Sequence, residues 1–193
     1  MRQKINGLHN DVITEFIDRY PNINWSDMFS RGQIDSKRWL VKYLIKSTET
    51  INDVVVCGGW CGILSKMLYM SNLNINSITS LDLEEKHTNV ANSIIKYPTF
   101  KAITCDMHDF DYIKVNTVIN TSCEHVENFS EWYSKVPQGR LMILQSNNYF
   151  EHSEHINCAK SLDEFKEQCP MDIVFSGELE LPLYKRFMLI GHK

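Results

Sequence analysis

The chain has no excess of basic residues and no long apolar run. Its 193 residues include 20 lysines and arginines against 24 aspartates and glutamates, giving a formal net charge of −4. A negative chain offers no general attraction for nucleic acid or anionic lipid. No apolar stretch approaches the roughly 20 residues of a transmembrane helix, and residues 1–7 lack the apolar core of a secretory signal. We therefore expect a cytoplasmic protein without a nucleic-acid or membrane partner.

The six cysteines do not make a compelling case for disulfides or for a zinc site. The six cysteines include no CxxC pair, and a chain of this size without a signal peptide is expected to keep its thiols reduced. Its length and its hydrophobic content of 43% suit one globular domain with a real core. We expect a single domain over residues 1–193, with a helical preface or lid over 1–48 and a core over 49–193.

Apolar periodicity predicts alternating strands and helices after that preface. The expected strands cover residues 54–57, 77–83, 101–105, 115–120 and 141–145, and the expected helices cover 8–20, 36–47, 62–70, 84–97, 127–135 and 161–168. Two strand-like runs at 172–180 and 184–192 resemble an antiparallel hairpin. This order predicts an α/β, Rossmann-like, doubly wound and mostly parallel seven-stranded sheet with a C-terminal antiparallel hairpin.

Glycine is scarce, yet three of the eight glycines directly follow the first predicted strand: Gly58, Gly59 and Gly62. Glycines between a strand and a helix let the backbone come close to a ligand where a side chain would collide. The motif therefore favours a nucleotide-like cofactor. The alternative is a tight strand–helix turn without a ligand.

Acidic residues lie at the ends of the next two strands. Asp82 follows the glycines by about twenty residues, a spacing at which a carboxylate can accept hydrogen bonds from a ribose diol. Asp106 is followed by Met107, a pairing that suits an adenine ring, with the acid accepting from the exocyclic amine. Either aspartate could instead cap the following helix or turn.

These signals, in this order, resemble the class I S-adenosylmethionine-dependent methyltransferases, from about Trp39 to the terminal hairpin. The resemblance implies S-adenosyl-L-methionine as the cofactor, with glycines beneath the methionine part, Asp82 at the ribose and Asp106 at the adenine. Trp60 stands where the family usually has the middle glycine, and Val56 where it usually has an acid. The implied cofactor-binding set is Gly58, Gly59, Trp60, Gly62, Asp82, Leu83, Asp106, Met107 and Asn120.

The segment 120–126, Asn-Thr-Ser-Cys-Glu-His-Val, resembles the small-molecule branch of that family, which includes quinone-pathway enzymes. It lacks the N/D-P-P-aromatic tetrapeptide that nucleobase amine methyltransferases carry here. We therefore expect a small-molecule acceptor, methylated at oxygen or nitrogen. Two alternatives stay open: another use of the same cofactor (aminocarboxypropyl transfer or cyclisation) and a non-catalytic cofactor-binding domain.

The candidate catalytic residues are Glu124, His125 and His155. The loop after the fifth strand, residues 146–158, is rich in histidine and glutamate and follows a strand end where substrate is expected. A histidine there could remove a proton from the acceptor. The alternatives are a metal site built from Glu124, His125 and a loop histidine, and a polar surface loop. No residue is assigned as a metal ligand.

Overall fold

The computed structural model of the chain describes residues 18–193, so most of the helix expected at 8–20 lies outside the described residues. The chain divides into two units, Met1–Ile34 and Asp35–Lys193. In the first unit, α2 (Trp25–Met28) is capped by the Asn24 side chain, which accepts a hydrogen bond from the backbone of Asp27. The single domain over 1–193 stays a prediction.

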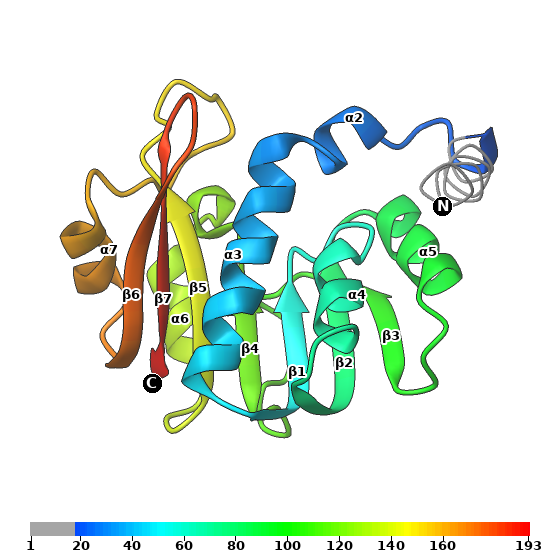
Figure 1. Cartoon of the computed structure of the whole chain (residues 1–193), viewed down its shortest axis with the longest axis horizontal. Coiled ribbons are helices and arrows are strands. Elements are labelled where there is room, and N and C mark those ends of the chain that lie inside the picture. Colours follow the sequence, from blue (N-terminus) through cyan, green and yellow to red (C-terminus); the bar gives the residue numbers. More distant parts are fainter. Residues whose placement is uncertain (1–17) are drawn as a thin grey trace, which may run out of the picture. The chain divides into compact units, whose positions relative to one another are not determined.

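The second unit contains a seven-stranded sheet in the order β3-β2-β1-β4-β5-β7-β6 (Figure 1). Its strands are β1 (Thr50–Cys57), β2 (Asn74–Asp82), β3 (Phe100–Thr104), β4 (Thr117–Asn120), β5 (Leu141–Asn147), β6 (Asp172–Glu180) and β7 (Lys185–His192). Strands β1 to β5 pair in parallel, and β7 lies antiparallel between β5 and β6. The predicted Rossmann-like sheet with a terminal hairpin is confirmed.

Helices cover both faces of this sheet (Figure 1). They are α3 (Arg31–Ser47), α4 (Ile63–Tyr69), α5 (Glu85–Ile94), α6 (Phe129–Lys135) and α7 (Leu162–Gln168). Alternate residues of β1 belong to the two cores: Val54 and Val56 pack with α3 and α4, while Val55 and Cys57 pack with α6 and α7. The alternation follows from the strand period of two, and it makes β1 a central strand buried on both faces.

Most elements begin or end one to five residues from the predicted bounds, and helix α5 and strand β5 are two examples. Helix α5 ends at Ile94, three residues before the predicted end, and the Asn92 side chain in its last turn exchanges two hydrogen bonds with the backbone of Ala102 in β3. Strand β5 continues to Asn147, two residues beyond the predicted end, because it pairs with β7 over that length. The buried end of β5 thus becomes part of the region where a ligand is expected.

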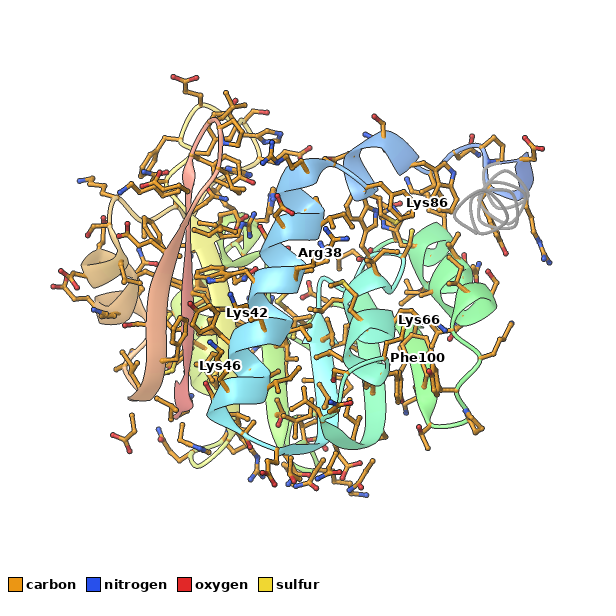
Figure 2. All side chains as sticks on the ribbon, viewed as in Figure 1. Arg38, Lys42, Lys46, Lys66, Lys86 and Phe100 are labelled. Carbon is orange, nitrogen blue, oxygen red and sulfur yellow. The ribbon has the colours of Figure 1, made fainter. Side chains whose placement is uncertain are left out.

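Helix α3 is amphipathic. Leu40 and Leu44 are buried, whereas Arg38, Lys42 and Lys46 are exposed at a spacing of four residues (Figure 2). This spacing places the three cations on one side of the helix. No helix among residues 18–193 is long and apolar enough to cross a membrane.

Gly62, in the turn after β1, is expected to tolerate substitution poorly. It has a φ of +81°, and a Cβ at this position would lie 2.7 Å from Ile95 Cδ1 and 3.1 Å from Ala91 Cβ. Gly62→Ala therefore combines backbone strain with overpacking, and we expect it to lower the free energy of unfolding by about 2–3 kcal/mol. Urea denaturation measures this loss.

Gly139 provides the matched control. Its φ is +78°, but a Cβ there would meet no atom within 4 Å. Gly139→Ala should cost about 1 kcal/mol, because only the backbone strain remains. Equal losses in the two variants would show that crowding against α5 contributes nothing.

Candidate cofactor and acceptor site

The turn after β1 brings backbone close to β2. The Gly59 amide donates to the Leu81 carbonyl at 2.8 Å, and a Cβ on Gly59 would lie 1.9 Å from Ser80 Oγ. Gly58 has a φ of +60° and Trp60 a φ of +50°. A non-glycine residue in this region is uncommon and costs energy, so the strained Trp60 must be held by its neighbours.

Asp82 is the residue that holds Trp60. Its Oδ2 accepts from the Trp60 amide at 2.8 Å, and its Oδ1 accepts from the Glu84 amide at 3.1 Å and from His87 Nδ1 at 2.9 Å. Trp60 Nε1 donates to His87 Nε2 at 3.1 Å. Because an indole N–H can only donate, the neutral His87 ring carries its proton on Nδ1 and donates it to Asp82. The three side chains form one chain of hydrogen bonds over the glycine turn.

The loop after β3 presents the second predicted acid. Asp106 is exposed, and its Oδ1 accepts from the backbone amide and Nδ1 of His108 at 2.8 and 2.9 Å. The bond from the backbone amide is the main cause that lowers the pKa of Asp106, so this carboxylate is ionised at neutral pH. Asn120, at the end of β4, donates its Nδ2 to Met107 Sδ at 3.6 Å.

Direct contacts connect these loops to one another. The turn after β1 bonds to Asp82 at the end of β2, and a Cβ on Gly58 would lie 3.8 Å from Ser122, which follows β4. The Met107–Asn120 bond joins the ends of β3 and β4. Leu83 is 69% exposed beside Asp82, so an apolar surface remains open at the same edge. The structure therefore brings the sequence-predicted cofactor residues to one edge of the sheet, at the carboxyl ends of the strands.

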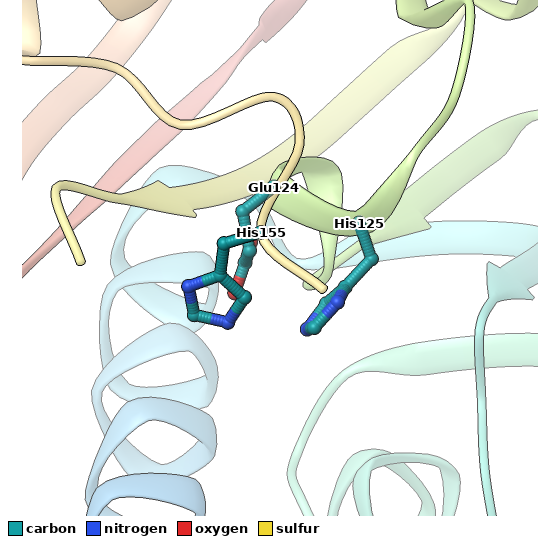
Figure 3. A group of neighbouring side chains, drawn as sticks. All are labelled: Glu124, His125 and His155. Carbon is teal, nitrogen blue, oxygen red and sulfur yellow. The ribbon is translucent and has the colours of Figure 1, made fainter. Parts of the chain in front are cut away.

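The predicted acceptor residues lie immediately beyond this edge. Glu124 and His125 belong to the short 3-10 helix η1 (Cys123–His125), and His155 belongs to the loop after β5. The Glu124 side chain is buried: its Oε1 accepts from Asn147 Nδ2 at 2.7 Å and from Arg186 Nη2 at 3.1 Å. Figure 3 shows the carboxylate beside the two imidazole rings. Glu124 is therefore fixed from the β5–β7 side.

Two backbone carbonyls orient the two rings. His125 Nδ1 lies 3.0 Å from the Glu154 carbonyl, and His155 Nδ1 lies 2.8 Å from the Tyr149 carbonyl. A carbonyl oxygen can only accept, so each Nδ1 carries a proton and each neutral ring keeps its lone pair on Nε2. The ring centroids of His125 and His155 are 4.6 Å apart, and those of His152 and His155 are 4.5 Å apart. Both candidate bases thus have a defined tautomer.

Burial lowers the pKa of His155 below its ordinary value of 6.5, against the opposite effect of its bond to Tyr149. A lowered pKa in the folded state means that the unfolded chain binds this proton more readily. The free energy of unfolding should therefore decrease as the pH falls below about 6.5. Urea denaturation between pH 8 and pH 5 in buffer containing a chelator measures this slope, which we expect to be smaller in His155→Gln.

His192 serves as the control for the loss of one imidazole. It is exposed at the end of β7, away from the histidine cluster of His125, His152 and His155. We expect His192→Gln to keep the pH slope of the unsubstituted protein. If His155→Gln also keeps it, burial of His155 does not contribute to the acid sensitivity.

Several residues of this region were missed from the sequence: His87, Asn147, Asn157 and Arg186. His87 follows Asp82 by five residues, a spacing that offers no motif. Arg186 could have been recognised from the sequence, because it is a charged residue within a predicted strand and is followed by two apolar residues, Phe187 and Met188. Such a position is buried only when the charge has a partner.

Three solved structures share this architecture. The N-methyltransferase NodS from Bradyrhizobium japonicum WM9 is 9% identical, covering 86% of this chain and 98% of its own with a TM-score of 0.67. Magnesium protoporphyrin IX methyltransferase (ChlM) from Synechocystis PCC 6803 with bound SAM is 15% identical, covering 95% and 96% with a TM-score of 0.65.

The third is a Burkholderia thailandensis 1,6-didemethyltoxoflavin-N1-methyltransferase with bound 1,6-didemethyltoxoflavin and S-adenosylhomocysteine. It is 12% identical, covering 99% of this chain and 89% of its own with a TM-score of 0.65. No model of a protein family matches the chain, and no curated protein matches it in sequence. The chain has the Rossmann-like fold of the class I S-adenosylmethionine-dependent methyltransferases.

Proposed function

We propose that this protein transfers the methyl group of S-adenosyl-L-methionine to an oxygen or nitrogen atom of a small molecule. The observation that carries the proposal is the connected edge at the carboxyl ends of β1 to β4. A glycine turn, two carboxylates and an amide lie at these strand ends, η1 with His125 begins shortly after β4, and the ring of His155 packs on that of His125. Each structural neighbour described above is named as a methyltransferase.

In this proposal the cofactor lies across the strand ends. The backbone at Gly58 and Gly59 passes beneath the methionine part, and at Gly59 a side chain is excluded by Ser80. Asp82 accepts from the ribose hydroxyls, and Leu83 contributes an apolar contact. Asp106 accepts from the adenine amine, and Met107, held by Asn120, covers one face of the ring. Trp60 and Gly62 shape the turn itself.

The chemical step needs few protein groups. Once bound at the strand ends, the cofactor would supply its methyl group to a lone pair of the acceptor, and its sulfur would keep the electron pair of the broken carbon–sulfur bond. The products are the methylated acceptor, S-adenosylhomocysteine and one proton. Nε2 of His125 or His155 is unprotonated in the neutral ring and takes that proton. The remaining contribution is alignment and exclusion of water.

The acceptor pocket is proposed at the loop after β5. Tyr149 stacks on Tyr184 with ring centroids 5.5 Å apart, and it contacts His155 edge-on at 5.8 Å. Phe150 is 55% exposed nearby in the same loop. Aromatic surface beside a few polar groups suits a small, partly apolar acceptor.

Product analysis tests the proposal. The purified protein is incubated with the cofactor and a library of small hydroxyl- and amine-bearing compounds, and the nucleoside products are separated. S-adenosylhomocysteine is the expected product. Methylthioadenosine would instead indicate aminocarboxypropyl transfer or cyclisation. Calorimetry without an acceptor provides the second measurement. Absence of cofactor binding would contradict methyl transfer and also the other enzymatic uses of the same cofactor.

A further inference from the structure

Tyr112 is a buried residue of the segment between β3 and β4. Its hydroxyl group lies 2.7 Å from the carbonyl oxygen of Met107 and 2.8 Å from Nε1 of Trp132. It also lies 3.5 Å from Sγ of Cys57. Met107 belongs to the loop after β3, Trp132 to α6, and Cys57 is the last residue of β1. One hydroxyl group therefore connects three separate elements.

The chemistry of these groups determines the direction of each bond. A carbonyl oxygen can only accept and an indole N–H can only donate. The single hydroxyl proton of Tyr112 therefore goes to Met107, and its oxygen accepts from Trp132 and from the Cys57 thiol. Burial raises the pKa of Tyr112, and it raises that of Cys57 to about 12, so both groups keep their protons at neutral pH. The bond from Tyr112 to Met107 is thus a permanent feature of the folded chain.

The Met107 end of this arrangement lies in the loop that is proposed to bind the adenine. Residues 105–116 form no helix or strand, so they have no ladder of backbone hydrogen bonds to fix them. The position of Met107 depends on individual contacts, which include its carbonyl bond to Tyr112 and its Sδ contact with Asn120. Asp106, the residue before it, is exposed and moves with the same piece of backbone.

The other end of the arrangement is rigid and adjoins the glycine turn. Cys57 directly precedes Gly58, and the side chains of Cys57, Trp132 and Tyr112 are buried in one apolar core. Closely packed cores resist displacement. The Tyr112 hydroxyl group therefore fixes the loop after β3 relative to the turn after β1.

We infer that Tyr112 is a positioning residue for the cofactor, acting through Met107 and Asp106. Its hydroxyl group holds this loop where the adenine and the methionine part of one cofactor molecule can be bound together. The inference rests on the proposed function, in which these two parts lie at the loop after β3 and at the glycine turn. Loss of the hydroxyl group would leave the Met107 carbonyl and the Trp132 N–H without a buried partner, which is costly. The loop is then expected to shift and to weaken the contacts to the base.

Tyr112→Phe tests the inference, because it removes the hydroxyl group and keeps the ring. Calorimetry compares S-adenosylhomocysteine with S-inosylhomocysteine, in which an oxygen replaces the exocyclic amine that Asp106 is proposed to bind. The unsubstituted protein should prefer the adenine compound by at least about tenfold, the value of one hydrogen bond to a charged group. In Tyr112→Phe we expect this preference to fall to about threefold or less.

Tyr133→Phe is the matched control. The Tyr133 hydroxyl group also donates to a backbone carbonyl, that of Pro170 at 2.8 Å, and its side chain is also buried. This bond joins α6 to the segment after α7. We expect Tyr133→Phe to lower the free energy of unfolding as Tyr112→Phe does, and to keep the full preference for adenine. A purely structural role of Tyr112 would not separate the two variants in this way.

A second measurement needs no cofactor. In protein labelled with ¹³C at the methionine methyl groups, the resonance of Met107 should shift in Tyr112→Phe and stay in place in Tyr133→Phe. Met70, exposed at the end of α4, serves as the reference in both variants. Circular dichroism checks that the variants are folded. If Tyr112→Phe is not, Cys57→Ala takes its place, because it removes the weakest of the three bonds and should shift the same resonance less.

The outcomes distinguish this inference from the proposed function. If the unsubstituted protein binds neither compound, the proposed function fails and the inference fails with it. If the unsubstituted protein prefers adenine and Tyr112→Phe keeps that preference, only the inference is overturned. A Met107 resonance that shifts in neither variant, or equally in both, would overturn it as well.

Discussion

Replacing Arg186 by methionine is expected to lower the free energy of unfolding by about 3–5 kcal/mol, because it leaves a buried charge without its partner. Arg186 is 5% exposed, and its guanidinium donates to Glu124 Oε1 and to the Thr121 carbonyl at 3.1 and 2.9 Å. Methionine fills similar volume but leaves Glu124 with only the Asn147 amide. Guanidinium denaturation followed by circular dichroism measures the loss.

A second substitution separates the charge from the packing. In the double variant Arg186→Met/Glu124→Gln the carboxylate is gone, so most of the lost stability should return. Lys185→Met is the matched control, since Lys185 forms exposed ion pairs with Glu178 and Glu180 and its loss should be far less costly than the loss of Arg186. A loss in Arg186→Met no larger than in Lys185→Met would contradict the burial argument.

The strands and the edge of the sheet were predictable because local pattern determines them. Val54 to Cys57 form a continuous apolar run between Asp53 and the glycine turn, and such a run becomes a central parallel strand. The glycines that follow mark the point at which this strand ends. When five parallel strands alternate with helices, the carboxyl ends of all five lie at one edge of the sheet, and ligands bind at that edge. Asp82 and Asp106 were therefore found by position alone.

The partners of these residues were not predictable, since they come from tertiary contacts. Glu124 and Arg186 are 62 residues apart in sequence, and they meet because β7 inserts between β5 and β6. The tautomers of His125 and His155 depend on two backbone carbonyls in a loop without a motif. The sequence shows which side chains are present, whereas the ring nitrogen that is left free to accept a proton depends on these carbonyls.

The structure also changes the interpretation of Trp60. The sequence indicated only that a large side chain replaces a glycine of the usual turn. The structure shows that its indole donates to His87, which donates to Asp82. The protein therefore already supplies a hydrogen-bond partner, His87, for the carboxylate that is proposed to bind ribose.

Asp82→Asn is expected to weaken binding of S-adenosyl-L-methionine by about 3 kcal/mol, on the order of 100-fold in the dissociation constant. Hydrogen bonds to an ionised acceptor are the strong ones, and the ribose diol offers two donors. Asparagine keeps an oxygen for the Trp60 amide, so the glycine turn retains its bond. Isothermal titration calorimetry without an acceptor measures the affinity.

His87→Ala is the control, because it removes the other half of the same pair and leaves the carboxylate intact. A carboxylate has about four lone-pair sites, and the backbone amides of Trp60 and Glu84 occupy two of them while His87 occupies a third. The ribose must share this acceptor with His87, so His87→Ala should bind the cofactor as tightly as the unsubstituted protein or several-fold more tightly. Opposite responses of the two variants would indicate competition for Asp82. Unchanged affinity in both would mean that the cofactor does not contact Asp82, and that the aspartate only supports the turn and the start of α5.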